Sequence, residues 1–343
     1  MQVPSSFARI EPELQRELRS LLESRTQPLY RMVEYQLGWT DEHGQPANAG
    51  RLQHHGVACA LAAEAAGGAL SKVMPAAAAL ELAHQFIRVH SEIQDGTPNN
   101  SRRFPVWWVW GPAQAINAGD GLHALARLSL VRLSDAGVPA PEVLDLLARM
   151  DKACLEVCEA QYQELSLQER LDVSLDTYVR VAEGKIGALL GCALELGSLL
   201  GGSQPSQAAA LRQAGRALGL ALQAQADIAV LWERRDSDPI PGDVLNKRKL
   251  LPFVLAFPSA QPKVKRELGG MYMQRMLEAA NLPQIATILA SLGAREASEQ
   301  HLGAWREQAF GHLDSAALSG SALGNLQELF AFLLEEARTP APL

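Results

Sequence analysis

The sequence has few cysteines, no long uncharged run and no excess of basic residues, and each shortage excludes a class of protein. Its four cysteines are too few for a disulfide-built fold, and they lie in Ala- and Leu-rich segments. We therefore predict buried, reduced thiols at Cys59, Cys154, Cys158 and Cys192. Cys154 and Cys158 are one helical turn apart, but no second Cys or His pair has the spacing that would complete a metal site.

Membrane and export signals are also missing. No apolar stretch reaches the roughly 20 uncharged residues that a membrane-spanning helix needs. The N-terminus shows no basic segment followed by an apolar one, so export is not expected and a cytoplasmic location is the default. The formal net charge of -7 and the scattered Lys and Arg residues give no general attraction to nucleic acid or to anionic membrane surfaces. We therefore predict no membrane span and no nucleic-acid partner.

What the sequence does contain is helical periodicity. Leu and Ala recur at three- and four-residue intervals over almost the whole chain, and no segment alternates convincingly as a strand. With 48% hydrophobic and 20% charged residues, the chain can bury one large core, so we predict a single all-α domain over residues 1–343. The predicted helices cover about residues 7–24, 27–37, 51–68, 75–95, 112–134, 141–166, 174–200, 205–233, 263–280, 283–309 and 320–338.

Three loops stand out by their polar composition, namely residues 38–50, 96–105 and 234–249. Each loop adjoins a long predicted helix whose end is polar. This arrangement is expected where a pocket opens at one end of a helical bundle.

Four segments together carry a resemblance to a known family. In chain order they are residues 81–95, 107–120, 184–197 and 218–232. The first and last are long helical segments with acidic residues near their C-terminal ends, around Asp95 and Asp227. The set resembles the trans-isoprenyl (polyprenyl) diphosphate synthases over about residues 30–260, with further helices at 261–338. The resemblance implies an isoprenoid-synthase-type helical bundle around a central apolar cavity, and a dimer.

Comparison with the family's motifs also shows that metal-binding carboxylates are depleted in this chain. In that family, two aspartate-rich helices present carboxylates at positions i, i+1 and i+4, which share one helix face. These carboxylates hold Mg²⁺, which clamps an allylic diphosphate and stabilises the negative charge of the leaving group. Here the first motif is Ser91, Glu92 and Asp95, and the second is Ala226, Asp227 and Val230. Both motifs are degenerate, so Glu92, Asp95 and Asp227 are only weak candidate metal ligands.

Basic groups that would contact a diphosphate are depleted as well. An early Gly-Lys-Arg run of the family falls near residues 51–56, where at most one basic side chain remains unless the histidines are protonated. A two-residue insertion brings Arg102 and Arg103 into register with an arginine pair of the family, whereas Asp238 replaces a lysine. The residues kept in the following loop are Asp243, Arg248 and Lys249. Because each lost ligand or cation costs a few kcal/mol, we expect ordinary chain elongation to be abolished.

The resemblance assigns roles to other residues, and each role has a structural alternative. The candidate catalytic residues are Lys185, Gln223 and Asp227. The candidate substrate-binding residues are Phe86, Arg102, Arg103 and Trp108. Phe86 would limit the length of a bound prenyl chain or else pack in the core, and Trp108 would line the cavity or be structural. Lys185 could equally pair on a helix face, and the two arginines could form a solvated loop pair.

Two further features bear on the site. Arg88 and Glu92 are i and i+4 on one helix, and their pairing would consume a carboxylate, although a solvated surface pair is the more common case. Four histidines raise the question of imidazole metal sites or proton shuttles in place of the lost carboxylates. They are His54, His55, His84 and His90. We favour packed or hydrogen-bonded helix histidines, because His84 and His90 are out of phase on their helix.

Two functions are compatible with these depleted motifs. The first is an isoprenoid-biosynthesis protein without conventional Mg²⁺-dependent chain elongation, acting as a non-catalytic partner or as an isoprenoid-binding protein. The alternative is a divergent prenyltransferase or terpene synthase acting on a short prenyl diphosphate or a related prenyl substrate. The first needs no cofactor, whereas the second would use Mg²⁺. We prefer the first, and we expect a homodimer or a heterodimer with an active prenyl diphosphate synthase.

Overall fold

The computed structural model describes residues 3–47, 53–96, 103–235, 238–318 and 321–338. Within these ranges the chain is helical, and the one strand-like pairing is an isolated bridge between Thr40 and Pro46. The all-α fold class is therefore confirmed. In chain order the elements are α1 (Ser5–Ser20), α2 (Leu29–Gln36), α3 (His54–Ala65), α4 (Leu70–Asp95), α5 (Val106–Trp110), α6 (Pro112–Val131), η1 (Arg132–Ser134), α7 (Ala140–Leu167), α8 (Leu175–Ala182), η2 (Glu183–Gly187), α9 (Ala188–Leu200), α10 (Pro205–Trp232), α11 (Gly242–Leu245), α12 (Leu251–Ala256), η3 (Phe257–Ser259), α13 (Pro262–Tyr272), α14 (Asn281–Ser291), α15 (Ala294–Ser315) and α16 (Ser321–Glu336).

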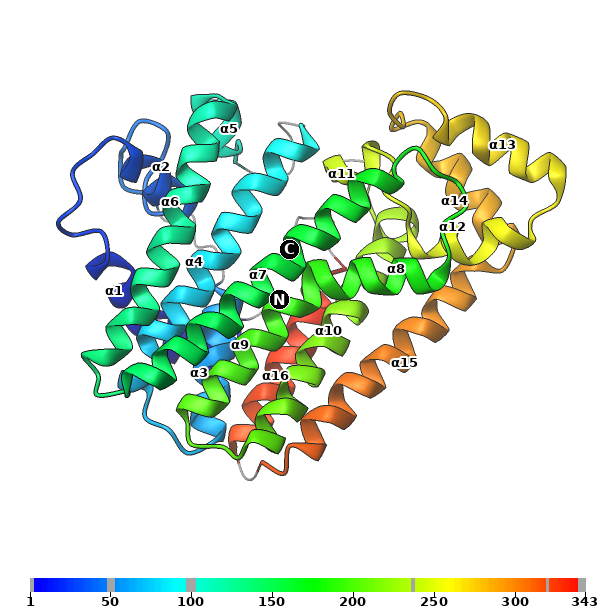
Figure 1. Cartoon of the computed structure of the whole chain (residues 1–343). Coiled ribbons are helices and arrows are strands. Elements are labelled where there is room, and N and C mark those ends of the chain that lie inside the picture. Colours follow the sequence, from blue (N-terminus) through cyan, green and yellow to red (C-terminus); the bar gives the residue numbers. More distant parts are fainter. Residues whose placement is uncertain (1–2, 48–52, 97–102, 236–237, 319–320, 339–343) are drawn as a thin grey trace.

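Long helices run side by side through the molecule, and shorter helices lie at two flanks (Figure 1). α4 packs along α3 and α6, while α10 packs along α9 and α15. α9 joins these two groups, because it also contacts α3, α4 and α7. Residues 188–198 of α9 are buried without interruption, as expected for a helix that is apolar on every side. α1, α2 and α5 lie at the α4 and α6 flank, and α11 to α14 lie at the opposite flank (Figure 1).

Glycines allow the central helices to approach closely. A Cβ atom added to Gly197 of α9 would lie 2.0 Å from the carbonyl oxygen of Cys59 in α3. A Cβ atom on Gly219 of α10 would lie 2.4 Å from the Cα of Gly187. Because both obstacles are backbone atoms, neither helix could accept a larger residue there without moving.

Gly197→Ala is therefore expected to lower the free energy of unfolding by about 1–3 kcal/mol, the usual cost of overpacking a core. Gly303→Ala in α15 is the matched control, since no atom lies within 4 Å of its added Cβ. The control should stabilise the helix by about 0.5–1 kcal/mol. Urea denaturation of both variants tests this packing, and equal effects from the two substitutions would contradict it.

The predicted helix boundaries need three corrections. The helix predicted over about 283–309 is two helices, because Gly293 adopts a left-handed conformation (φ 73) between α14 and α15. The helix predicted over about 263–280 ends at Tyr272. The helix predicted over about 174–200 contains a π-helical segment, η2, between α8 and α9. The short helices α5, α11 and α12 were not predicted, because four to six residues are too few to show a period.

The four cysteines are free thiols. Cys59, Cys154 and Cys192 are buried, as predicted, and burial raises the pKa of each thiol. The prediction of burial is wrong for Cys158, which is exposed on α7. Cys158 lies about 40° further round α7 than Cys154, because the helix has 3.6 residues per turn. Cys154 is at the edge of the buried face, so Cys158 falls on the solvent side.

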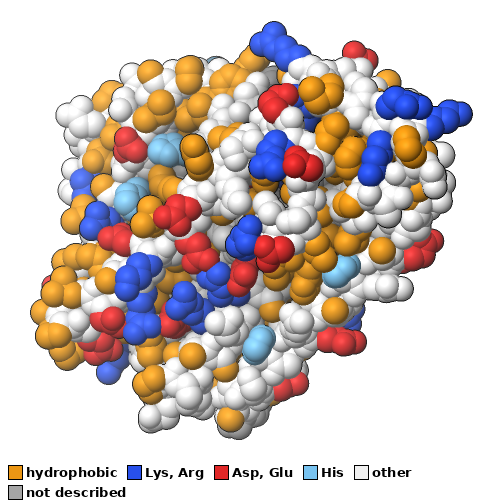
Figure 2. Space-filling view, turned by 45° about the vertical axis from the view of Figure 1, so that its right-hand side comes forward, with side chains coloured by type: hydrophobic (Ala, Val, Ile, Leu, Met, Phe, Trp, Pro, Cys, Tyr) orange, Lys and Arg blue, Asp and Glu red, His pale blue; other side chains and the backbone are white. Residues whose placement is uncertain are grey.

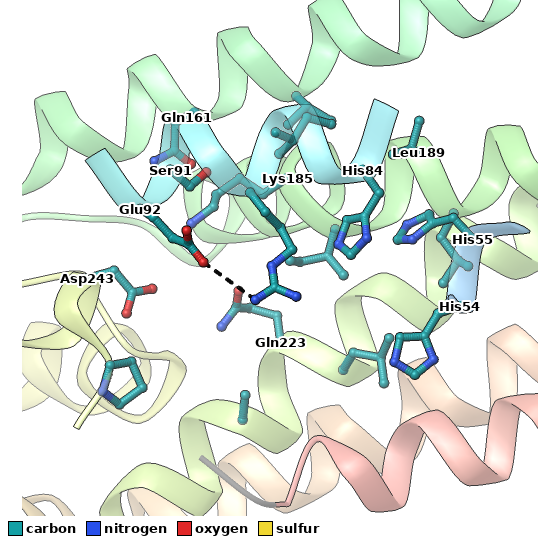
Figure 3. A pocket seen from close by; sticks show the side chains of 18 of the residues that line it. His54, His55, His84, Ser91, Glu92, Gln161, Lys185, Leu189, Gln223 and Asp243 are labelled. Atoms are coloured by element: carbon teal, nitrogen blue, oxygen red, sulfur yellow. Dashed lines mark ion pairs between the residues drawn. The ribbon is translucent and has the colours of Figure 1, made fainter. Parts of the chain in front are cut away.

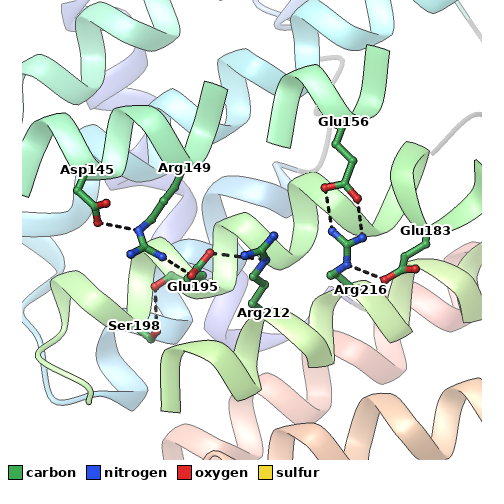
Figure 4. A network of polar contacts seen from close by, with 8 residues as sticks. All are labelled: Asp145, Arg149, Glu156, Glu183, Glu195, Ser198, Arg212 and Arg216. Carbon is green, nitrogen blue, oxygen red and sulfur yellow. Dashed lines mark hydrogen bonds and ion pairs between the residues drawn. The ribbon is translucent and has the colours of Figure 1, made fainter. Parts of the chain in front are cut away.

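Ion pairs tie α7, η2, α9 and α10 together (Figure 4). Arg216 of α10 pairs with Glu156 of α7 at 2.5 Å and with Glu183 of η2 at 2.6 Å. Arg149 of α7 pairs with Glu195 of α9 at 2.6 Å. Arginine forks of this kind fix orientation as well as distance, so they hold the helices that carry the site in register.

The surface carries mixed charge. On the face in Figure 2, Lys and Arg side chains lie among Asp and Glu side chains and do not form one continuous basic stripe. Among the described residues, no helix combines the length and the apolar character that crossing a lipid bilayer requires.

Candidate functional site

A cavity of about 190 Å³ lies among α4, α7, η2, α9 and α10 (Figure 3). Its walls are mainly aliphatic and include Ile87, Val157, Ile186, Leu189, Leu190 and Leu222. Asp243 and Glu92 lie toward one end of the view (Figure 3). His54, His55 and His84 lie toward the other end, which is called the histidine end of the cavity. A cavity with aliphatic walls and with polar and charged side chains gathered toward its ends suits a ligand that has an apolar chain and a polar head.

Lys185 lies in the π-helical segment, an irregularity that often occurs at functional sites. The side chain of Lys185 lines the cavity and donates a hydrogen bond to Glu164 of α7. Burial alone would lower the pKa of Lys185, but Glu164 and Asp243 raise it above its ordinary value. Lys185 is therefore a charged amine inside the cavity, as its role as a candidate catalytic residue requires.

The first degenerate motif lies in the last turns of α4, and Ser91, Glu92 and Asp95 all line the cavity. Glu92 Oε1 lies 3.5 Å from Arg88 Nη2, so the suggested pair forms. The interpretation of that pair as a solvated surface pair is wrong, because the two side chains are only 15% and 7% exposed. Glu92 Oε2 is buried and accepts no hydrogen bond from any residue that the structure describes, so one ligand oxygen remains available.

Asp95 lies at the end of α4, close to Asp243 of α11. Burial, followed by the negative charge of Asp243, raises the pKa of Asp95 to about 8. Burial would also raise the pKa of Asp243, but Arg248 and Lys185 lower it below its ordinary value. At neutral pH the two carboxyl groups therefore share one negative charge unless a cation joins them.

This shift makes stability depend on pH. Asp95 has a pKa of about 8 in the folded state against 3.8 when exposed, so the folded state holds a proton that the unfolded chain has lost. The contribution of Asp95 to stability is therefore lost as the pH rises between about 4 and 8. In EDTA, we expect Asp95→Asn to have the higher melting temperature at pH 8 and to differ little from the wild type at pH 4. A variant less stable than the wild type at pH 8 would contradict the burial of this carboxyl group.

The carboxylate of the second degenerate motif is closed off from the cavity, although Ala226 of the same motif lines it. Asp227 of α10 is fully buried, and both of its oxygens are saturated by donors. Oδ1 accepts from Gln223 Nε2 at 2.8 Å and from Arg248 Nη1 at 2.5 Å. Oδ2 accepts from the Tyr178 hydroxyl at 2.9 Å and from the Leu251 amide at 2.8 Å. A metal ion could reach Asp227 only by displacing these partners.

The remaining sequence candidates fall in several places. Gln223 lines the cavity. Phe86 lies outside the lining, where its ring packs between His90 and His123 at centroid distances of 5.0 and 4.8 Å. Trp108 is 52% exposed and stacks on Phe104. The substrate-binding roles of Phe86 and Trp108 stay predictions, and neither side chain contacts this cavity.

Of the candidate pair Arg102 and Arg103, only Arg103 lies within the described residues. Arg103 donates a hydrogen bond to the Thr40 carbonyl and lies over the Tyr35 ring, 3.5 Å from its centroid. Its guanidinium is therefore held in the loop beside α2, and its contact with phosphate stays a prediction.

At the histidine end of the cavity, the side chains of His55, His84 and Glu81 lie close together. His55 of α3 lies against His84 of α4, with ring centroids 4.2 Å apart. His84 Nδ1 lies 3.8 Å from Glu81 Oε1, and Glu81 is fully buried. Burial lowers the pKa of both imidazoles. Burial would raise the pKa of Glu81, but His84 and His55 lower it to about 2.

Sequence reasoning missed two residues of the site. Glu164 of α7 binds Lys185, and Tyr178 of α8 binds Asp227. Neither has a signal of its own, because acidic residues recur along α7 and a single tyrosine in a short helix is commonplace. Only the distance between helices reveals the partnership.

Comparison with known proteins identifies the family. The polyprenyl synthetase family matches residues 49–289. A geranylgeranyl diphosphate synthase of Mycobacterium tuberculosis is 32% identical over 278 residues, which cover 80% of this chain and 78% of that protein. A (2E,6E)-farnesyl diphosphate synthase of Mycobacterium bovis is 34% identical over 247 residues, covering 71% of this chain and 66% of that protein. The crystal structure of a polyprenyl synthetase from Streptomyces coelicolor A3(2) aligns with a TM-score of 0.84 at 28% identity, covering 98% of this chain and 99% of that one. The resemblance seen in the sequence is confirmed, and the chain belongs to the polyprenyl synthetase family, with its isoprenoid-synthase fold.

Proposed function

We propose that this isoprenoid-biosynthesis protein is an enzyme that acts on one short prenyl diphosphate, as a divergent prenyltransferase or a terpene synthase. The polarity of the cavity carries this proposal, because aliphatic walls from α7, α9 and α10 adjoin Glu92, Asp95 and Lys185. A prenyl chain in the apolar part gains about 0.8 kcal/mol for each buried CH₂ group. The diphosphate would then lie at the carboxylate end.

Mg²⁺ fits the donor set at that end. Glu92 offers a buried oxygen that has no partner among the described residues, and burial and the neighbouring Asp243 raise the pKa of Asp95, so two carboxyl groups lie close together there. Magnesium prefers oxygen ligands from one or two carboxylates together with substrate phosphates. When bound there, Mg²⁺ would neutralise charge on the leaving diphosphate. We propose Glu92, Asp95 and Asp243 as its ligands.

Asp227 has a different proposed role. Its four hydrogen bonds make it a poor metal ligand, but they fix Arg248, which also pairs with Asp243 at 2.6 Å. We infer that Asp227 is a positioning residue, which holds Arg248 and Gln223 at the cavity. Lys185 and Arg248 would then orient the diphosphate, while the aliphatic walls exclude water from the reacting carbon.

A second diphosphate substrate is not supported by the described lining. Among the described residues, the cavity-lining Lys and Arg side chains are Arg88, Lys185 and Arg248. Lys185 and Arg248 are assigned to the first diphosphate, which leaves Arg88, and this side chain pairs with Glu92. Near the histidine end, His54 and His55 fall where the family's basic run is expected. A second anion there would lie among imidazoles of lowered pKa, so we propose that the enzyme does not perform ordinary chain elongation.

The sequence alone favoured a non-catalytic partner or an isoprenoid-binding protein, and the comparisons do not support that preference. The relatives are named as synthases, which favours the enzyme alternative. The retained cavity favours it too, since a purely structural partner has no need for a charged lysine and a free carboxylate oxygen in an apolar chamber.

Calorimetric titration with farnesyl diphosphate tests this assignment. We expect binding that strengthens with Mg²⁺ and that Asp95→Asn weakens at least about tenfold, since a hydrogen bond to a charged group is worth about 1.5–3 kcal/mol. Asp172→Asn, in an exposed loop, is the control and should bind normally. Affinity that is unaffected by Mg²⁺ would rule out the carboxylate end as the diphosphate site.

The predicted dimer stays a prediction, with a candidate surface. Large apolar side chains are exposed on neighbouring helices, namely Leu128 and Val131 of α6 with Leu155 and Tyr162 of α7. Exposed apolar groups in such number favour a protein–protein contact. Light scattering on the purified protein should give twice the chain mass, and Leu155→Glu should shift it toward the monomer.

A further inference from the structure

We propose that His55, Glu81 and His84 form a binding site for a divalent transition-metal ion of the zinc class. Their ligand atoms all lie within 4.8 Å of one another. Glu81 and His84 are i and i+3 on one face of α4, and His55 reaches them from α3. The site lies at the end of the cavity where Figure 3 shows the histidines, away from Asp243, and it does not depend on the proposed function.

Unpartnered nitrogen atoms are the first reason. His55 Nδ1 and His84 Nδ1 are both buried, and neither has a hydrogen-bond partner within the described parts of the chain. Most buried polar atoms in folded proteins are paired, so two orphaned nitrogens side by side call for an explanation. A metal ion accounts for two neighbouring lone pairs at once.

Glu81 is held as a metal ligand would be. Gln36 Nε2 donates to Gln85 Oε1 at 2.8 Å, and Gln85 Nε2 donates to Glu81 Oε1 at 2.8 Å. The three side chains are all at least 98% buried. The Gly56 amide donates to the other oxygen, Oε2, at the longer distance of 3.5 Å. Buried donors of this kind orient a ligating carboxylate. Packing alone would not need a relay of three polar groups.

The charge of Glu81 is the third reason. Among the described residues, the basic group within ion-pair distance of Glu81 is His84, whose Nδ1 lies 3.8 Å from Glu81 Oε1. A carboxylate that is 0% exposed and lacks a strong cation is costly. A divalent ion would offset this cost.

The ligand types select the metal. Imidazole nitrogen favours zinc, copper, iron and nickel, whereas magnesium takes oxygen ligands. Zinc accepts two histidines and one glutamate at about 2.0–2.2 Å and keeps a fourth position open. Zinc binding would require the imidazole rings, now tilted by 32° to each other, to rotate so that the ligands close in. The fourth position would face the cavity.

Equilibrium dialysis of the full chain against Zn²⁺ and Co²⁺ tests the proposal. Cys158→Ser serves as the background, since Cys158 is an exposed thiol, and excess Mg²⁺ occupies oxygen sites. We expect one ion per chain and visible Co²⁺ bands without a thiolate signal. His55→Ala and His84→Ala should each weaken binding by more than about 100-fold, because loss of even an outer partner costs about 10- to 100-fold.

His43→Ala is the matched control, since His43 lies in an exposed loop far from the cluster in sequence, and it should bind normally. Circular dichroism of each variant separates loss of binding from loss of folding. Glu81→Gln, which keeps the shape of the buried side chain, gives a second route if an alanine variant unfolds. Binding that survives in the folded double variant His55→Ala/His84→Ala, or no stoichiometric binding by the parent, would overturn the site.

Discussion

Asp227→Ala is expected to lower the free energy of unfolding by about 3–5 kcal/mol, the cost of breaking a buried charge pair from one side. The substitution leaves the buried Arg248 guanidinium with only Asp243 as an ion-pair partner. It also removes the acceptor of Gln223, of the Tyr178 hydroxyl and of the Leu251 amide. Each buried donor without a partner adds its own desolvation penalty. Urea denaturation followed by circular dichroism measures the loss.

Glu299→Ala provides a matched comparison. Glu299 pairs with Arg295 on the exposed face of α15, with both side chains more than 40% exposed. Exposed pairs of this kind contribute less than about 1 kcal/mol, so the control should unfold almost like the wild type. If Asp227→Ala proves no more destabilising than Glu299→Ala, Asp227 is not the hub of a buried network, and its assignment as a positioning residue fails.

Asp95→Asn is expected to reduce Mg²⁺-dependent turnover of a prenyl diphosphate by about 100-fold or more, the effect of removing one group that stabilises developing charge. The same variant should be more stable than the wild type at pH 8, because burial and Asp243 raise the pKa of Asp95 to about 8. Activity and stability would therefore move in opposite directions. That combination distinguishes a strained functional carboxyl group from a structural one. Pyrophosphate release and thermal melting measure the two quantities.

Two outcomes would contradict this role. Turnover that falls together with stability would indicate that the variant is merely misfolded. Turnover that is unchanged would show that Asp95 does not take part, whatever its pKa. Asp172→Asn, exposed and far from the cavity lining, should change neither quantity.

Much of the fold could be predicted from the sequence because helical periodicity is a local property. α6, α7 and α10 lie within a few residues of their predicted limits. The predicted boundaries are wrong where the same local pattern is compatible with two backbone conformations. The helical periodicity runs on across Gly293, so the sequence predicts one helix there. The left-handed backbone of Gly293 instead separates α14 from α15. The π-helical turn around Lys185 has no sequence signature, since it depends on how η2 packs against α7 and α10.

The site was predictable only in part, for a related reason. Motif positions indicated which side chains would lie near the cavity, and Lys185, Gln223, Glu92 and Asp95 do line it. Motif positions could not show which of these side chains would have their polar atoms already hydrogen-bonded to other residues. Asp227 was a candidate metal ligand in the sequence, yet its oxygens are occupied by donors from α8, α10, α12 and the segment before α12. Apart from Gln223, one turn away on α10, these partners are distant in the chain and emerge only from packing.

The histidines show another limit of predicting a site from spacing in the sequence. The sequence comparison of His84 with His90 discouraged a metal site, because those two residues lie out of phase on α4. The structure instead brings His84 together with His55 from another helix and with Glu81 one turn away. Spacing within a helix predicts ligand sets on that helix, but it carries no information about a neighbouring helix.

Pyrophosphate release by the purified protein from farnesyl diphosphate, with Mg²⁺ and with or without isopentenyl diphosphate, tests the central claim most directly. We expect Mg²⁺-dependent release from farnesyl diphosphate alone, with water as the default acceptor and no acceleration by isopentenyl diphosphate, because Arg88 is the one described lining Lys or Arg not assigned to the first diphosphate, and it pairs with Glu92. Release that requires isopentenyl diphosphate and yields a longer prenyl chain would contradict a single-diphosphate enzyme. No release from geranyl, farnesyl or geranylgeranyl diphosphate would contradict catalysis by this cavity.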